Sequence, residues 1–284
     1  MNSKTVLITG ASTGIGRASA RHMDRLGWDV FAGVRKETDG DALAKEASSR
    51  LTPVILDVTD SATIEAAAKS IGEATGSAGL GGLVNNAGIT VQGPLEYLSL
   101  DEMRKQLEVN VVGQLAVTQA FLPLIRKGKG RLVFMSSIAG RARALPLVGP
   151  YSASKRALEA IGEGLHDELL PWDIKVSLIE PGSVATEIWE KGDSTFDELI
   201  EALPPEGRER YEKAAHKGRK LAAATGRRGI PPERVADKVA HALTSQHPRF
   251  RYLVGIDAKA RALVEPLIPG SLRKKGVKRM LYGK

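Results

Sequence analysis

The stretch Lys4-Thr-Val-Leu-Ile-Thr-Gly10-Ala-Ser-Thr-Gly14-Ile-Gly16 lies near the N-terminus and contains two structural signals in succession. Residues 4–9 are mostly β-branched or apolar and stop at Gly10, so they predict a short buried strand. Helical periodicity from Gly14 to about Leu26, ended by Gly27, predicts a helix directly after it. Glycines between the two allow a tight turn, and the helix N-terminus offers free N–H groups to an anion. This combination indicates a phosphate-binding turn of the kind that holds a nucleotide.

Strand and helix signals continue to alternate along the chain. The strands are apolar throughout, which indicates a parallel sheet covered by helices on both faces. Right-handed crossovers then predict a doubly wound, seven-stranded, Rossmann-like sheet in a three-layer α/β/α architecture, with a ligand crevice at the carboxyl ends of the strands. Further strands are predicted at 29–34, 53–58, 82–88, 131–137, 174–182 and 251–255, and helices at about 39–50, 60–74, 100–126, 151–170 and 232–245. We expect one domain over residues 1–256, including a largely helical insert at 187–230.

Composition excludes several classes of chemistry. The chain of 284 residues is 42% hydrophobic and 26% charged, as in ordinary globular proteins. It has no cysteine, which removes disulfides, thiolate catalysis and cysteine-bound zinc, and its five histidines lack metal-ligand spacing, so we expect no metal. No uninterrupted apolar segment is expected to span a bilayer, and the first strand begins too early for a signal peptide. A cytoplasmic protein is therefore expected.

Positive charge is concentrated at the C-terminal end. Residues 219–284 hold 16 Lys and Arg against 4 Asp and Glu, whereas residues 1–218 hold 25 against 29. The basic tail, 257–284, mixes Leu272 and Leu281 with cations, so its last part, 267–284, could lie on an anionic membrane, remain solvated or pack on a neighbouring subunit. Without a known nucleic-acid-binding motif, we expect no nucleic-acid partner.

Tyr151 and Lys155 carry the clearest catalytic signal. Four residues apart at the start of a predicted helix, they project from the same face. A tyrosine with pKa of about 10 is a poor base near neutrality, and a neighbouring ammonium would lower that value and bring proton transfer toward working pH. The alternative is a partly buried tyrosine beside a solvated lysine. Ser137 ends one predicted strand, and Asn110 stands among apolar helix neighbours and needs a polar partner.

Together these motifs resemble the short-chain dehydrogenase/reductase family, in its shorter single-domain branch. The matching order extends across residues 4–186, and the general layout continues to about 255. The motifs are Thr9-Gly-Ala-Ser-Thr-Gly-Ile-Gly16, Asn85-Asn-Ala-Gly88, Asn110, Ser136-Ser-Ile-Ala-Gly140, Tyr151-Ser-Ala-Ser-Lys155 and Pro181-Gly182. The gap from Ser137 to Tyr151 is one residue longer than the family's usual spacing, and we place the extra residue in the loop Arg141–Pro146.

The resemblance implies specific roles. Tyr151 would be the general acid and base, Lys155 would lower its pKa and bond the nicotinamide ribose, Ser137 would orient the substrate oxygen, and Asn110 would anchor a water relay. Besides Tyr151 and Lys155, the implied cofactor-binding residues are Gly10, Ser12, Thr13, Gly14, Ile15, Gly16, Arg35, Lys36, Asp57, Val58, Asn86, Ala87, Gly88, Pro181, Gly182, Val184 and Thr186.

The end of the second strand bears on cofactor choice. An acidic residue there bonds the ribose 2′-hydroxyl of NAD, whereas a basic one accepts the 2′-phosphate of NADP. Gly33-Val34-Arg35-Lys36 has no carboxylate, and Arg35 can make a bidentate phosphate contact, so NADP is favoured and NAD is the second choice. Thr13, where many NADP-specific relatives are basic, weakens this preference.

By resemblance, residues 187–230 would form a substrate lid, and the chain looks most like members that act on steroids, retinoids or similar lipophilic alcohols. An apolar pocket could be lined by Leu145, Leu147, Val148, Ile188, Trp189, Phe196 and Leu199, or these could pack on the domain instead. We expect an NADP(H)-dependent alcohol/carbonyl oxidoreductase, with an NAD-dependent alcohol dehydrogenase or a non-catalytic dinucleotide-binding regulator as alternatives. Helices 100–126 and 151–170 are expected to form a homodimer or homotetramer.

Overall fold

Seven parallel strands form one sheet in the order β3-β2-β1-β4-β5-β6-β7, which confirms the predicted doubly wound fold. This computed structural model describes residues 3–186, 200–201 and 203–282. The order reverses between β1 and β4, and in such sheets a ligand crevice opens at that point, beyond the carboxyl ends of the strands. The strands are β1 (Thr5–Ile8), β2 (Asp29–Val34), β3 (Leu51–Ile55), β4 (Gly82–Asn85), β5 (Arg131–Met135), β6 (Lys175–Pro181) and β7 (Arg251–Val254).

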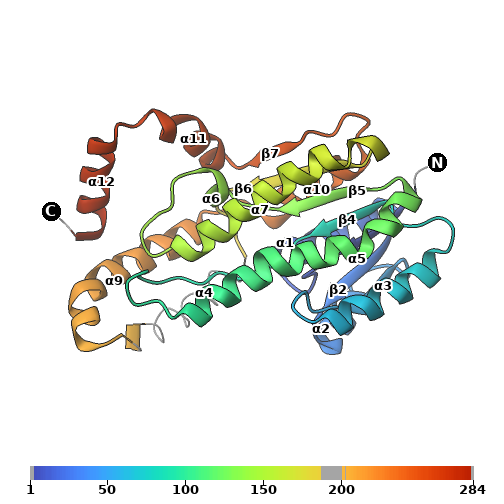
Figure 1. Cartoon of the computed structure of the whole chain (residues 1–284), viewed down its shortest axis with the longest axis horizontal. Helices are drawn as coiled ribbons and strands as arrows, with labels where there is room; N and C mark the ends of the chain where they lie inside the picture. Colours follow the sequence, from blue (N-terminus) through green and yellow to red (C-terminus); the bar gives the residue numbers. More distant parts are fainter. Residues whose placement is uncertain (1–2, 187–199, 202, 283–284) are drawn as a thin grey trace.

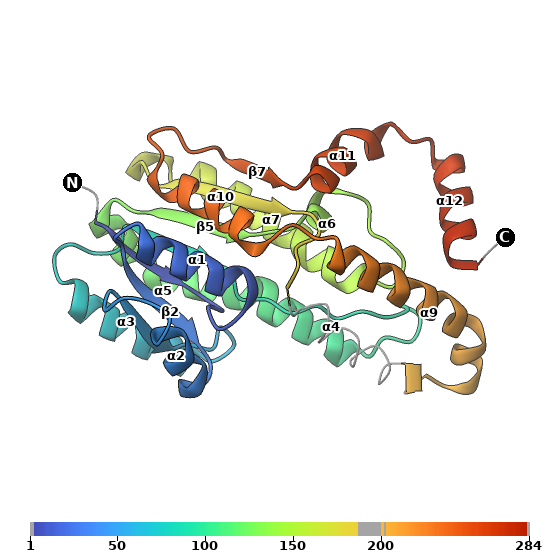
Figure 2. The same cartoon turned by 180° about the vertical axis from the view of Figure 1, so that it is seen from behind.

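Helices cover both faces of the sheet (Figures 1 and 2). One layer contains α1 (Gly14–Arg25), α2 (Glu37–Ala44) and α10 (Pro232–Thr244), and the other contains α3 (Ser61–Thr75), α5 (Gly113–Gly128) and α7 (Gly149–Glu168). Alternate residues of β1 enter different cores: Val6 and Ile8 pack with the first layer and Leu7 with the second. Both strand faces are thus buried, which explains why the strands are apolar at every position.

The predicted helix 100–126 is one long helix that is interrupted at its centre by a π-helical turn. It consists of α4 (Leu100–Leu107), a π-helical turn η1 (Glu108–Val112) and α5. By length and composition, Leu100–Gly128 could cross a membrane, so the expectation that no segment could do so is wrong on those criteria. However, Val117, Phe121 and Ile125 are fully buried against the sheet, as in a core helix of a folded domain.

Two predicted boundaries near the second and third strands are wrong. Helix α2 ends at Ala44 rather than at Arg50, because the Asp24 carboxylate accepts hydrogen bonds from the backbone and hydroxyl of Ser48 and holds that segment in a turn. Strand β3 therefore starts at Leu51, two residues earlier than predicted. It contains Pro53, which is tolerated because β3 lies at the edge of the sheet.

The C-terminal third adds helices beyond one end of the sheet, where α12 lies beside α9 and α11 lies beside α6 (Figures 1 and 2). Helix α9 (Pro205–Arg227) belongs to the predicted insert, whose two ends are joined by a bridge between Val184 and Ile230. The predicted tail is helical as well, forming α11 (Ile256–Val264), η3 (Glu265–Leu267) and α12 (Gly270–Tyr282). Arg273 of α12 donates a 3.1 Å hydrogen bond to the carbonyl oxygen of Ala144, which ties the last helix to the loop before α7.

Candidate active site

The turn between β1 and α1 is shaped by three glycines. Gly10 has a φ of +63°, and a Cβ there would lie 2.8 Å from the Ala87 Cα atom. A Cβ on Gly16 would lie 2.1 Å from the Gly10 carbonyl oxygen, and one on Gly14 would meet Thr186. The first turn of α1 has no acidic residue, so its positive dipole end is free of competing anions. These features fit a dinucleotide diphosphate lying against the backbone.

Hydrogen bonds made by Thr9 and Asn86 join this turn to the end of β4. The Thr9 hydroxyl oxygen accepts 3.0 Å hydrogen bonds from the backbone N–H groups of Asn86 and Ala87. In return, Asn86 Nδ2 donates to the carbonyl oxygens of Thr9 and Gly10, at 2.9 and 3.1 Å. Both sides of the crevice between β1 and β4 are therefore fixed in advance of ligand binding.

A ladder of side chains fastens the chain after β4 to the long helix. Residues four apart on the helix rise about 6 Å, and residues two apart in extended chain rise about 6.6 Å, so the two spacings match. The pairs are Asn85–Thr118 at 2.8 Å, Ala87–Gln114 at 2.7 Å, Ile89–Asn110 at 2.8 Å and Val91–Gln106 at 2.6 Å. The ladder holds residues 85–91 along one wall of the cavity.

Asn110 is fully buried in the π-helical turn, and all of its polar atoms are paired. Its Oδ1 accepts from the Ile89 N–H, while its Nδ2 donates to the Ile89 carbonyl and to Ser154 Oγ. Lys155 Nζ lies close by, since a Cβ on Gly88 would be 3.3 Å from Asn110 Oδ1 and 3.8 Å from that nitrogen. The side chain of Asn110 thus positions the wall beside Lys155, and π-helical turns often occur at functional sites.

Ser137 and Tyr151 meet across the cavity end of the sheet. Ser137 follows β5 and caps the short helix α6 (Ile138–Arg141), with its Oγ accepting a 3.1 Å hydrogen bond from the Ala139 N–H. Burial raises the pKa of the Tyr151 phenol, and a hydrogen bond with Ser137 partly opposes that effect. The expected lowering of this pKa is therefore wrong in net direction, because the phenol is buried.

Lys155 is the buried cation of the site. Its Nζ donates a 2.7 Å hydrogen bond to the Met135 carbonyl oxygen and lies 5.8 Å from the centroid of the Tyr151 ring. Burial lowers the pKa of Lys155 to about 8, and the nearby Glu159 carboxylate opposes this. At pH 7 the ammonium is thus still the major form, but it loses its proton far more easily than a solvated lysine.

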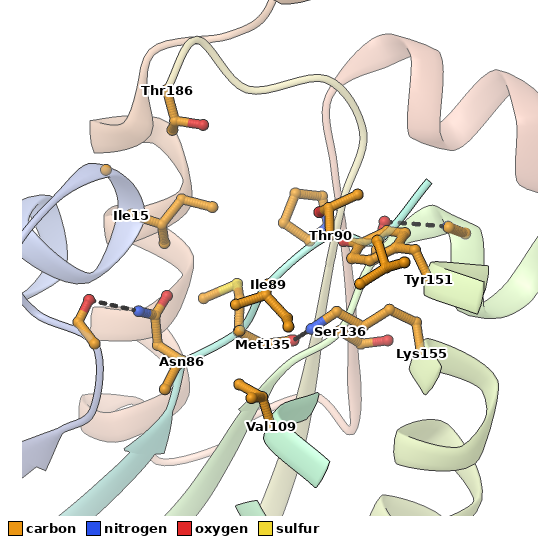
Figure 3. A pocket seen from close by; sticks show the side chains of 18 of the residues that line it. Ile15, Asn86, Ile89, Thr90, Val109, Met135, Ser136, Tyr151, Lys155 and Thr186 are labelled. Atoms are coloured by element: carbon orange, nitrogen blue, oxygen red, sulfur yellow. Dashed lines mark hydrogen bonds between the residues drawn. The ribbon is translucent and has the colours of Figure 1, made fainter. Parts of the chain in front are cut away.

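The glycine turn, Ser137, Tyr151 and Lys155 face one cavity of about 1250 Å³, with Ile15, Asn86 and Thr186 toward one end and Tyr151 and Lys155 toward the other (Figure 3). Nearly every predicted cofactor residue lines it, including Arg35 and Asp57. Two predicted residues lie outside this lining: Asn110 stands behind the wall, and Lys36 occupies the N-cap position of α2 beside Arg35.

Sequence reasoning missed several lining residues. Ile89, Thr90, Val91 and Gln92 extend the predicted Asn85–Gly88 motif along the ladder, and Met135 precedes the predicted serines. Asp257 lines the cavity from α11, and its Oδ2 accepts a 2.7 Å hydrogen bond from the Ser183 N–H, which fixes the loop after β6. No short-range pattern could have found Asp257, because it acts on a segment 74 residues away in sequence.

The end of the cavity that is lined by the segment before α7 is partly apolar. Leu145, Leu147 and Val148 line it as expected, together with Gly218 of α9 and the guanidinium-bearing Arg143 and Arg261. Helix α9 is anchored beside it because Glu96 accepts 2.7 Å hydrogen bonds from Arg210 and Tyr211. The other predicted pocket residues, Ile188, Trp189, Phe196 and Leu199, lie outside the described residues.

Comparison with known proteins adds to this geometry. A family model for short chain dehydrogenases matches residues 4–196. The chain is 38% identical over 279 residues to 17-beta-hydroxysteroid dehydrogenase type 6 of Bos taurus, covering 96% of the chain and 87% of that protein. It is 37% identical over 286 residues to retinol dehydrogenase 7 of Mus musculus, covering 99% and 89%.

A solved structure shows the same fold over almost the whole chain. It is a short chain dehydrogenase from Burkholderia cenocepacia in complex with NADP, with a TM-score of 0.72 and 25% identity. The match covers 96% of this chain and 97% of that one, so the similarity includes the C-terminal part as well as the dinucleotide-binding half.

Proposed function

Because the chain belongs to the short-chain dehydrogenase/reductase family, it is an oxidoreductase that acts on CH–OH donors, and we propose that it interconverts a lipophilic alcohol and its carbonyl with NADP(H). One observation carries the proposal: Tyr151, Ser137 and Lys155 face the same cavity as the glycine turn. A dinucleotide seated on that turn can extend its reactive end toward the tyrosine.

The bound cofactor supplies or accepts the hydride, and the chain handles the proton. In reduction, Tyr151 Oη donates its proton to the carbonyl oxygen as that oxygen gains negative charge; in oxidation, the phenolate takes the proton from the alcohol. Ser137 donates a hydrogen bond to the same substrate oxygen, and its Oγ also accepts a hydrogen bond from the Ala139 N–H, which fixes its position. The Lys155 ammonium stabilises the phenolate and would hold the nicotinamide ribose of the bound cofactor.

Arg35 supports the preference for NADP. It lies in the cavity lining directly after β2, and the residues around it, Gly33 and Val34, provide no carboxylate for a ribose 2′-hydroxyl. A guanidinium binds a phosphate through two charge-assisted hydrogen bonds, each stronger than a neutral one. The NADP complex of the Burkholderia relative is compatible with this preference.

The test is a fluorescence titration of the protein with NADPH and with NADH. Replacing Arg35 with alanine removes a charge-assisted phosphate contact, so NADPH affinity should fall on the order of 10- to 100-fold while NADH affinity changes little. Lys36→Ala is the matched control, because Lys36 is a neighbouring cation outside the described lining. NADH binding as tight as NADPH binding, with Arg35→Ala silent, would disprove the NADP preference. A panel of steroid, retinoid and short polar carbonyls then tests the substrate class.

The C-terminal helices support a peripheral membrane contact, which would deliver a lipophilic substrate near the apolar end of the cavity. Leu263 and Leu267 are 75% and 78% exposed, and α12 presents Lys274, Lys275 and Lys278 to solvent. Exposed apolar side chains beside cations suit an anionic lipid surface. In sedimentation with phosphatidylserine vesicles, removing residues 271–284 should reduce the fraction of protein that pellets with the vesicles. An unchanged fraction would refute a contact through α12.

Oligomerisation is proposed for the outer faces of the long helix and α7. Val112 is half exposed in the centre of that helix although it is apolar. An isologous contact between two copies would cover it and give a homodimer, or a homotetramer if two such contacts exist. Light scattering of the eluting protein decides between these states, and a monomer unaffected by Val112→Glu would exclude the contact.

A further inference from the structure

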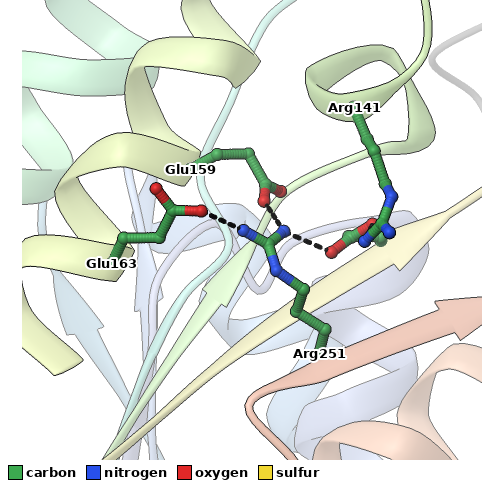
Figure 4. A network of polar contacts seen from close by, with 5 residues as sticks. Arg141, Glu159, Glu163 and Arg251 are labelled. Carbon is green, nitrogen blue, oxygen red and sulfur yellow. Dashed lines mark hydrogen bonds and ion pairs between the residues drawn. The ribbon is translucent and has the colours of Figure 1, made fainter.

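A cluster of five charged residues lies behind the active site, where α6, α7, β6 and β7 meet (Figure 4). Arg251 is its centre: its Nη1 pairs with Glu180 at 2.7 Å and with Glu159, and its Nη2 pairs with Glu163. Arg141 Nη1 approaches the other oxygen of Glu180 at 3.9 Å. The cluster thus joins the C-terminal strand to the helix that carries Tyr151 and Lys155.

The members of this cluster differ in burial, and their charges do not cancel. The Glu180 side chain is fully buried and Glu159 is nearly so, while Arg251 is 25% and Glu163 58% exposed. Three carboxylates face two guanidiniums, which leaves one excess negative charge. A buried charge is costly unless another charge compensates it. Glu163 is the solvated member of the three carboxylates, whereas Glu159 and Glu180 are the buried ones.

Lys155 is the buried cation that precedes Glu159 on the same helix. Glu159 follows it by four residues on α7, and residues at this spacing are neighbours on one helix face. Lys155 has one described hydrogen bond, to Met135, which leaves two ammonium protons for other groups. The Glu159 carboxylate also raises the pKa of Lys155 against the effect of burial.

The Glu159 carboxylate also lies near the hydroxyl of Ser136, the residue before Ser137. The Glu159 Oε1 and the Ser136 Oγ are both buried and have no hydrogen-bond partner of full geometry. Burial raises the pKa of the Glu159 carboxyl, and the Ser136 hydroxyl and the Arg251 guanidinium partly oppose that effect. The carboxylate therefore adjoins both the lysine and the serine segment that face Tyr151.

Beside Lys155, the neighbouring residue Ser154 contacts only neutral side chains of the described elements packed against α7. Helix α4 presents Gln106 and the π-helical turn presents Asn110, both neutral and both bonded to Ser154. Helix α6 contributes Arg141, β6 contributes Glu180 and β7 contributes Arg251, all within the cluster; α7 itself adds Tyr151 and Glu163. Glu159 is thus the carboxylate through which the cluster acts on Lys155.

We propose that Glu159, held by Arg251 and its partners, is a positioning residue that keeps Lys155 charged and so sets the pH range over which Tyr151 can exchange its proton. The inference rests on the proposed function for the role of the tyrosine, but not for the state of the lysine. Removing the negative charge of Glu159 favours the uncharged amine, so Lys155 must then lose its proton at lower pH.

The experiment is an NMR titration of the full chain labelled with ¹³C at the lysine ε-carbon, without cofactor or substrate. The Lys155 resonance is identified by its loss in Lys155→Met. In the wild type it should titrate near pH 8, apart from the solvated lysines. In Glu159→Gln it should titrate about one pH unit lower, the size expected for one close charge.

Glu163→Gln is the matched control, since it removes a carboxylate from the same guanidinium on the same helix, but at a solvent-screened position. It should leave the Lys155 titration within a few tenths of a unit of wild type. Glu159→Asp, which keeps the charge, should restore most of the wild-type value. If Glu159→Gln does not fold, Glu159→Met removes the same charge without a buried amide and should move the Lys155 titration in the same direction. A Lys155 titration that moves in none of these variants overturns the inference.

Different results would refute the proposed function and this inference. A wild-type protein that binds neither NADPH nor NADH would refute the enzyme while the lysine titration could still respond to Glu159. If both hold, the fall of kcat/KM for carbonyl reduction with rising pH should move to higher pH in Glu159→Gln, because less positive charge beside Tyr151 raises the pKa of the phenol that donates the proton. A purely structural role for Glu159 would lower activity at every pH without moving the profile.

Discussion

Lys155 Nζ and the Met135 carbonyl oxygen are joined by a 2.7 Å hydrogen bond, which ties α7 to the last residue of β5. The ammonium is almost fully buried there, and burial brings its pKa down from 10.5 to about 8. Burial in the fold therefore destabilises the charged form of Lys155, and the cost in free energy of unfolding can be measured.

Lys155→Met should stabilise the protein while it removes activity. A pKa lowered from 10.5 to about 8 corresponds to a destabilisation on the order of 3 kcal/mol at pH 7, and the lost hydrogen bond offsets about 1 kcal/mol of the gain. We expect the free energy of unfolding to rise by about 2 kcal/mol in urea denaturation at pH 7.

The pH dependence gives an independent check of sign. Between about pH 8 and 10.5 the unfolded wild type binds more protons than the folded form, so wild-type stability should rise with pH in that window relative to Lys155→Met. The two proteins should therefore converge as pH increases. A constant difference across the window, or a less stable variant at pH 7, contradicts the assignment of a buried, destabilising ammonium.

Tyr151→Phe separates an enzyme from a dinucleotide-binding regulator. Phenylalanine keeps the ring and removes the hydroxyl that would transfer the proton, so kcat should fall on the order of 100- to 10,000-fold. NADPH affinity should change by less than about threefold, because the glycine turn is untouched. Cofactor binding is measured by fluorescence and turnover by NADPH absorbance. A variant with wild-type turnover would remove Tyr151 from the mechanism.

Gly16→Ala should destroy the cofactor cradle, whereas Gly27→Ala should not. A Cβ on Gly16 would lie 2.1 Å from the Gly10 carbonyl oxygen, so the turn would have to open. Gly27, with φ of +77°, has open space around it, and its substitution should cost only about 1 kcal/mol of backbone strain. We expect loss of NADPH binding in the first variant alone. Equal cofactor affinity in both would mean that close packing at Gly16 does not shape the site.

The regular part of the fold and the dinucleotide crevice could be predicted because they depend on local patterns. Strands such as Val6-Leu7-Ile8 are buried on both faces, and glycines mark the turn that follows. The π-helical turn at Asn110 could not be found this way, since one extra residue in a helix hardly changes its apolar periodicity. The early end of α2 depends on the contact between Asp24 and Ser48, which lies between distant residues.

The charged cluster shows why the residues packed behind Lys155 could not be predicted. Glu159, Glu180 and Arg251 look like surface residues when each is considered in its own segment, because charged residues are mostly exposed. Their burial follows from the meeting of α7, β6 and β7, which sequence spacing does not reveal. For the same reason, the net direction of the Tyr151 pKa could not be predicted from its distance to Lys155 in sequence.

The ladder between the long helix and residues 85–91 predicts unequal effects for two similar glutamines. Gln106 is bonded at both ends, to the Val91 N–H and to the Ile89 carbonyl, whereas Gln114 donates to Ala87 while its own Oε1 is buried without a partner. Gln106→Met leaves a buried N–H unsatisfied and should cost about 2 kcal/mol of stability. Gln114→Met also removes an unsatisfied oxygen and should cost less than about 1 kcal/mol. Urea denaturation of the two variants, which have the same change in side-chain chemistry, measures the difference. If Gln114→Met proves the more damaging, the bonds of the ladder do not determine its energetics.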